Sequence, residues 1–134
     1  MNKKIAKITK TKIPRRWILE DREKPWTVNT ERTWHFHKRA KAVRECRERF
    51  GWLVAEQKIP KLDQVKISIV PLAKDKRGIQ DVGACLPAAK AAVDAIVDMG
   101  VIPDDDPKHV LALTFFATQV IGYDGLRVVI TEAS

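Results

Sequence analysis

The chain has 134 residues, of which 45% are hydrophobic and 31% charged, and its formal net charge is +8. This length suits one domain with a single core of ordinary size. No run of 18 apolar residues is present, and the Lys-rich N-terminus lacks the apolar stretch of a secretory signal, so we expect a cytoplasmic protein without membrane spans. Cys46 and Cys85 form no Cys-x-x-Cys pair, which argues for free thiols and against a disulfide scaffold or a zinc ribbon.

Positive charge is concentrated in the N-terminal part of the sequence. Residues 1–50 carry 16 Lys and Arg against 6 Asp and Glu, whereas residues 51–134 carry 9 against 11. A surface this basic favours a polyanionic partner, because each neutralised phosphate releases condensed counterions. The charge pattern therefore indicates nucleic acid as the first candidate partner and an anionic membrane surface as the second.

The N-terminal part of the sequence predicts a basic arm, a strand and a long helix. Residues 1 to about 14 are typical of a basic arm or an edge strand, and residues 15–21 (RRWILED) are a short strand candidate. From about Glu31 to Glu56 the apolar residues recur every three to four positions, which is helical spacing. The other faces of this helix carry the largest group of cations in the chain.

The middle of the sequence predicts a strand, a loop and a second helix. Residues 63–73 (DQVKISIVPLA) begin with alternating apolar and polar side chains, the period of a half-buried strand. Residues 74–84 follow as a loop. We expect a helix over residues 86–100, since Pro87 suits a first helical turn and Gly100 suits a C-terminal cap.

The C-terminal part predicts two strands, at residues 109–121 and 126–132, joined by a turn at Asp124-Gly125. The predicted order is then strand, helix, strand, helix, strand, strand. This order indicates a single α+β domain over residues 1–134, with two main helices on a small mixed sheet.

Acidic residues in the C-terminal half form an unusual group. Between residues 75 and 106 every acidic residue is Asp, and Asp104, Asp105 and Asp106 are consecutive. They follow the end of a predicted helix, where the macrodipole is already negative. Unit charges 4 Å apart repel by roughly 4 kcal/mol at an effective dielectric of 20, so a partly buried triplet calls for a cation such as Mg²⁺. The alternative is an ordinary turn, because Asp-Pro is common in turns.

Lys90 lies one helical turn before Asp94 and two before Asp98 on the second predicted helix. It is either a solvated partner of Asp94, worth a few tenths of a kcal/mol, or a cation that stabilises charge on a phosphate during hydrolysis. Among the aromatic residues we expect Trp34 and Trp52 in the core, and we regard Trp26 as the candidate for stacking on an unpaired base.

The sequence resembles the RusA family of Holliday junction resolvases. The resemblance rests on a loop Asp (Asp81), Lys90 within KAAVDAIVDMG, and a short apolar step into the Asp104-Asp105 pair. It extends to VNTERTWHFHKRA upstream and to the closing GLRVVITE, and covers most of residues 26–132. It implies a RusA-like homodimeric endonuclease of bacterial or phage-infected cytoplasm. Such an enzyme uses Mg²⁺, with Mn²⁺ as a substitute, to resolve four-way or branched DNA junctions, and needs no nucleotide cofactor or membrane.

The same resemblance implies roles for individual residues. Asp81 and Asp105 correspond to metal-binding catalytic carboxylates, Asp104 to an accessory ligand and Lys90 to the catalytic lysine. The cations that we expect to follow the DNA backbone are Arg32, Lys38, Arg39, Lys41 and Arg44.

One departure from the family pattern leaves a second function open. Many members carry an Asp-x-Asp-Asn block shortly before the lysine, whereas this chain has QDVGACLPAAK, with one Asp nine positions before Lys90. Asp75 could replace the missing carboxylate, or the protein could bind branched DNA without cutting it. A third possibility is an oligomeric protein whose Asp triplet is only a turn and whose cations contact RNA.

The length of the second predicted helix raises a question of geometry. At 1.5 Å per residue the helix is about 20 Å long, which separates Asp81 from Asp105 unless the loops fold back. We therefore consider a hypothesis in which two such helices pack antiparallel through their alanine faces, so that Asp81 of one subunit approaches Asp105 of the other.

Overall fold

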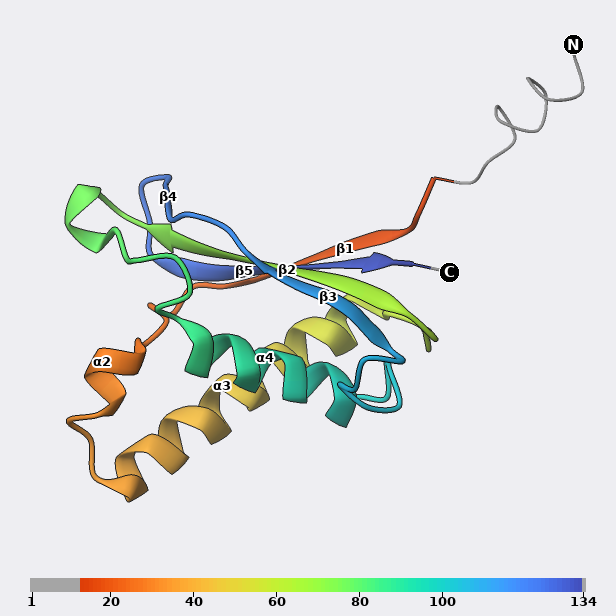
Figure 1. Ribbon diagram of the computed structural model, residues 1–134, viewed down its shortest axis with the longest axis horizontal. Helices are drawn as coiled ribbons and strands as arrows, with labels where there is room; N and C mark the ends of the chain where they lie inside the picture. The colour runs from red at the N-terminus through yellow and green to blue at the C-terminus, as the bar shows by residue number, and fades with distance from the viewer. Residues whose placement is uncertain (1–12, 134) are drawn as a thin grey trace, which may run out of the picture.

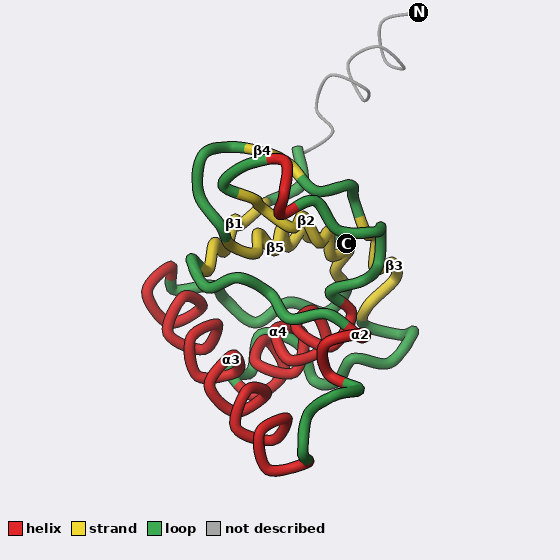
Figure 2. The backbone as a smooth tube through the Cα atoms, turned by 90° about the vertical axis from the view of Figure 1, so that its left-hand side faces the viewer, coloured by secondary structure: helices red, strands yellow, loops and turns green. Residues whose placement is uncertain are grey.

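The computed structural model describes residues 13–133. The helices and strands, in chain order, are β1 (Arg16–Asp21), α2 (Val28–Glu31), α3 (Phe36–Gln57), β2 (Val65–Ala73), the 3₁₀ turn η1 (Lys76–Gly78), α4 (Leu86–Asp98), β3 (Val110–Phe115), β4 (Gln119–Val120) and β5 (Gly125–Glu132). The sheet forms one layer, and α3 and α4 cover one of its faces (Figures 1 and 2). The predicted α+β class and element order are confirmed. The basic arm expected at about residues 1–14 lies outside the described residues, apart from Ile13 and Pro14.

Strand β2 lies in the centre of the sheet. It pairs antiparallel with β5 on one side and parallel with β3 and β4 on the other, while β1 pairs antiparallel with β5. Seven of its nine residues are buried, which suits a strand with neighbours on both edges. The turn at Asp124-Gly125 therefore does not close a hairpin between neighbouring strands, because β2 separates β3 from β5.

The strand predicted at residues 109–121 is divided into β3 and β4. Between them, the Phe116 amide donates to the carbonyl of Ile69 (2.9 Å), and the Thr118 hydroxyl accepts from the amide of Gln80 (3.1 Å). The second bond ties the break in the strand to the loop before α4.

The first long helix begins later than predicted, at Phe36 rather than Glu31. His35 is extended (φ −64°, ψ 149°), and its Nδ1 accepts a hydrogen bond from the amide of His37 (3.3 Å), so it caps α3. Trp34 precedes this cap. It lies outside the helix and packs near Trp26, with ring centroids 6.1 Å apart.

Small residues dominate α4. Its buried side chains are Ala88, Ala89, Ala91, Ala92, Val93, Ala95 and Ile96. They belong to the same core cluster as Phe50 of α3 and the inner residues of the sheet, and short side chains allow close helix packing. The alanine faces are thus covered within the chain, so they are not available for the antiparallel packing of two subunits that we considered from the sequence.

Two further expectations concern the cysteines and the membrane. Cys46 and Cys85 are buried free thiols, as predicted, and burial raises their pKa values to about 12 and about 11. Between residues 13 and 133 no helix combines the length and the apolarity that a bilayer span requires.

Candidate active site

The loop that follows α4 folds back along the helix. Gly100 ends the helix with a positive φ of 76°, a conformation that costs glycine little. Val101 and Ile102 are then buried in the core, and the carbonyl of Val101 accepts from the amide of Leu62 (2.6 Å). This anchoring turns the next residues, the Asp triplet, back toward the middle of α4.

The carboxylates of Asp104, Asp105 and Asp106 have different hydrogen-bond partners. Asp104 accepts a hydrogen bond from the amide of Asp105 (2.8 Å), and Asp106 accepts one from the amide of Lys108 (3.1 Å), so both support the turn. Asp105 instead reaches Lys90, with 2.5 Å between Oδ2 and Nζ. The interpretation as a turn and the interpretation as a charged site thus apply to different members of the triplet.

Lys90 has a second carboxylate nearby, since Asp94 Oδ1 is 3.8 Å from its Nζ. The hydrogen bond to Asp105 raises the pKa of Lys90, and the same bond lowers the pKa of Asp105. Both groups are therefore charged at neutral pH. The Lys90 and Asp105 side chains remain 53% and 31% exposed, so a ligand from solvent can reach them.

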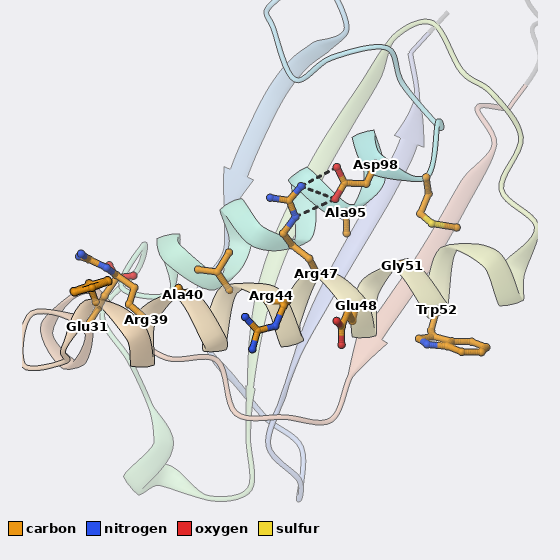
Figure 3. Close-up of a pocket in the computed structure, with 13 residues that line it drawn as sticks. Glu31, Arg39, Ala40, Arg44, Arg47, Glu48, Gly51, Trp52, Ala95 and Asp98 are labelled. Carbon is orange, nitrogen blue, oxygen red and sulfur yellow. Dashed lines mark hydrogen bonds and ion pairs between the residues drawn. The ribbon is translucent and has the colours of Figure 1, made fainter.

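Arg47 of α3 completes this cluster, and sequence reasoning did not single it out. Its Nη2 lies 2.6 Å from Asp98 Oδ2, and its Nη1 lies 4.0 Å from Asp94 Oδ2 (Figure 3). Arg47 thus ties Asp94 and Asp98 of α4 to α3. Arg47 and Asp98 are 51 residues apart, and only the helix packing brings them together.

Asp81 and Asp75 lie apart from this cluster. Their loop leads into the N-terminal end of α4, whereas the Asp105 loop leaves its C-terminal end (Figure 1). Asp81 is exposed, and its carboxylate makes no hydrogen bond or ion pair with any residue from 13 to 133. Asp75 accepts from the Arg77 amide and pairs with its guanidinium (2.8 Å), which lowers the pKa of Asp75.

The described part of the chain contains no group of three His, Cys, Asp or Glu side chains that could hold a metal ion. Mg²⁺, however, is often bound by one or two carboxylates together with water and substrate phosphates. Asp104 and Asp105 supply two adjacent carboxylates, so they fit this smaller donor set, with the Lys90 ammonium beside Asp105 as a competing cation.

The five predicted DNA contacts fall into two groups. Arg32, Lys38 and Lys41 are exposed and lie outside a groove lined by residues of α3 and α4. Arg39 and Arg44 line that groove, which runs between α3 and α4 with a volume of about 890 Å³ (Figure 3).

The core positions predicted for Trp34 and Trp52 are both wrong, since neither belongs to the core cluster of the described residues or packs against it. Trp52 is 77% exposed on α3, so its predicted core position is wrong. Trp34 is half-buried, as is Trp26, whose Nε1 donates to Glu31 (3.4 Å). Trp26 and Trp34 line a second cavity of about 530 Å³, so the stacking role of Trp26 remains a prediction.

The sequence matches no protein-family model, and a search of curated proteins finds no match.

Proposed function

We propose that the protein is a RusA-like, Mg²⁺-dependent endonuclease that acts on four-way or branched DNA. The observation that carries this proposal is the contact between Lys90 and Asp105, beside Asp104 and Asp94. A partly exposed ammonium next to adjacent carboxylates combines a phosphate-binding group with ligands for a hard cation. The basic N-terminal half supports a polyanionic substrate.

Each residue of the cluster has a definite task in this proposal. Asp104 and Asp105 would hold Mg²⁺ or Mn²⁺, which when bound supplies a Lewis acid and lowers the pKa of a bound water. Lys90 binds a phosphate oxygen and stabilises the negative charge that develops there. Asp94 helps to hold the ammonium in place. Arg47 fixes Asp94 and Asp98 through its ion pairs, and it is therefore a positioning residue.

The exposed cations Arg32, Lys38 and Lys41 would contact DNA phosphates. Contacts of this kind orient the duplex and add affinity but do not read sequence. Lys38 also lies over the Trp34 ring, 5.0 Å from its centroid, and Lys41 is 3.8 Å from Glu45. Both contacts are solvent-exposed and weak, so each ammonium can exchange its partner for a phosphate.

A labelled four-way junction incubated with and without Mg²⁺ tests the proposal. We expect symmetric nicks only with the metal, and a loss of at least about 100-fold in Asp105→Asn or Lys90→Met, because the first change removes a metal ligand and the second removes the ammonium that acts on the reacting phosphate. Junction binding by gel shift should persist in both variants. Asp63→Asn, which changes an exposed Asp outside the cluster, is the matched control and should cut normally.

A second candidate, a protein that binds branched DNA without cutting it, is favoured by one observation. Within residues 13–133 no third carboxylate joins Asp104 and Asp105. The same experiment separates the candidates, because a junction that is bound but intact with Mg²⁺ and with Mn²⁺ supports the second. A junction that is neither bound nor cut contradicts both.

A further inference from the structure

The cavity beside Trp26 shares no lining residue with the Lys90 cluster or with the groove between α3 and α4. Its volume of about 530 Å³ lies within the size range of small-molecule sites. Residues of two loop segments, 23–34 and 77–80, line it together with three side chains of α3. The cavity is therefore built from parts of the chain that are distant in sequence.

Hydrogen bonds hold the two loop segments together. The Gln80 Nε2 donates to the carbonyl of Pro25 (3.2 Å), and the Val28 amide donates to the carbonyl of Ala84 (2.9 Å). The Gln80 amide also donates to the Thr118 hydroxyl (3.1 Å), which fixes the second segment to the link between β3 and β4. Contacts within the chain thus form the cavity before any ligand binds.

The Gln80 side chain has an unused hydrogen-bond acceptor. Its Oε1 is buried and has no hydrogen-bond partner among the residues that the structure describes. A buried acceptor without a donor costs roughly 1–3 kcal/mol, so such an atom indicates a missing partner. Because Gln80 lines the cavity, a ligand in the cavity can supply that donor.

Two indole rings form the aromatic part of the cavity. Trp26 and Trp34 are both half-buried, with ring centroids 6.1 Å apart. The Trp26 Nε1 donates to Glu31 (3.4 Å), which helps to fix the ring. Lys38 lies over the Trp34 ring, 5.0 Å from its centroid. Trp26 is therefore the ring on which a flat ligand is best placed to stack.

Two exposed cations, Lys24 and Arg77, line the same cavity from the two loop segments. Arg77 pairs with Asp75 (2.8 Å), but this pair is exposed and therefore weak, so the guanidinium can exchange the carboxylate for a phosphate. A nucleotide joins a flat ring with N–H donors to a phosphate. A neutral apolar ligand would leave both the cations and the Gln80 acceptor without a partner.

We propose that this cavity binds one unpaired base of a DNA strand. The base stacks on Trp26, an N–H of its Watson–Crick edge donates to Gln80 Oε1, and Lys24 and Arg77 bind the neighbouring phosphates. Stacking tolerates any base, so the site is selective for unpaired bases and not for sequence. The inference rests on the proposed function, because branched DNA exposes unpaired bases, and it adds a contact region separate from Lys90 and Asp105.

Fluorescence anisotropy without divalent metal measures binding independently of cutting. The probes are three labelled four-way junctions with identical arms. One is fully paired, one carries a single unpaired thymine at the point of strand exchange, and one carries an abasic residue there. We expect the wild type to bind the thymine junction at least about 5-fold more tightly than the abasic junction, the lower limit for one stacked base.

Trp26→Ala should bring the ratio of these two affinities close to 1. Trp52→Ala is the matched control, as it removes an exposed indole outside the cavity, and it should keep the wild-type ratio. The ratio compares two probes on one protein, so a fraction of unfolded Trp26→Ala lowers both affinities and leaves their ratio unchanged. A junction with unpaired N3-methylthymine, which keeps the ring but has no N–H, should bind the wild type several-fold more weakly than the thymine junction.

The outcomes distinguish this inference from the proposed function. A wild type that binds every junction with a thymine-to-abasic ratio near 1 would overturn the inference alone. A wild-type ratio that survives in Trp26→Ala, or equal affinity for thymine and N3-methylthymine, would also overturn it. A protein that binds none of the junctions, the fully paired one included, would contradict the proposed function itself.

Discussion

Two charged regions of the helical layer differ in how their charges are satisfied. On α4 and the loop that follows it, every charged residue of the cluster has a partner within the chain: Lys90, Asp94, Asp98 and Asp105. On the outer ridge of α3, Arg44 and Glu48 have none among the described residues and lie between exposed apolar groups. The first region holds its own loop in place, whereas the second has charges and apolar area left over for another molecule.

The largest expected effect is on the free energy of unfolding, and it should distinguish the buried face of α3 from its exposed face. Phe50→Ala should lower the free energy of unfolding by about 3–5 kcal/mol, because Phe50 is fully buried. Trp52→Ala should change it by less than about 0.5 kcal/mol, because Trp52 is exposed. Urea denaturation measures both values. A comparable loss for Trp52→Ala would show that the indole packs within its own chain.

The α4 cluster should have a smaller effect on stability, and this effect should depend on pH. Asp105 has a lowered pKa, so its contribution is present above the ordinary value of 3.8 and is lost as the pH falls through the lowered value. Lys90 has a raised pKa, so its contribution is present below the ordinary value of 10.5 and is lost as the pH rises through the raised value.

Between these limits the wild type should exceed Asp105→Asn in unfolding free energy by a constant amount of at most about 1 kcal/mol, since the pair is partly exposed. The difference should shrink in acid, and urea denaturation at several pH values measures it. A difference that grows below pH 3.8 would contradict the assignment of the ion pair.

The smallest expected effect is on the salt dependence of junction binding. It should differ between the cations that we expect to contact DNA and those that line the groove. Lys41→Gln should reduce the slope of log K against log salt for junction binding by about 0.9, the value for one lost phosphate contact. Arg47→Gln should leave the slope unchanged, because Arg47 of the groove is already paired with Asp98 and Asp94. Fluorescence anisotropy over a series of salt concentrations gives both slopes. Equal changes in the two variants would indicate that the groove is open to DNA.

The sequence predicted the elements well where local chemistry decides them. The alternation in residues 63–73 indicated β2, and Pro87 and Gly100 bracketed α4 closely. The start of α3 was placed too early, because the helical spacing runs on through Trp34 while His35 adopts an extended conformation and caps the helix. Trp52 was placed in the core, since spacing alone does not tell which of two apolar ridges faces inward.

The candidate site was predictable only in part. The spacing between Lys90 and Asp105 pointed to a charged cluster, and the structure brings these two residues together. Arg47 could not be found from the sequence, because nothing local distinguishes it from the other cations of α3. Asp81 remains a predicted ligand, and the described chain does not bring it to Asp105.

The sequence by itself determined the two main helices and the central strand, and that the chain carries a basic half and an Asp-rich half. These properties depend on residue spacing and charge, which are local. Tertiary structure decided that β2 separates β3 from β5, that the Asp105 loop folds back onto Lys90, and that Arg47 is neutralised while Arg44 is not. Those outcomes depend on which distant groups packing brings within a few ångströms, and side-chain pairing is decided at that range.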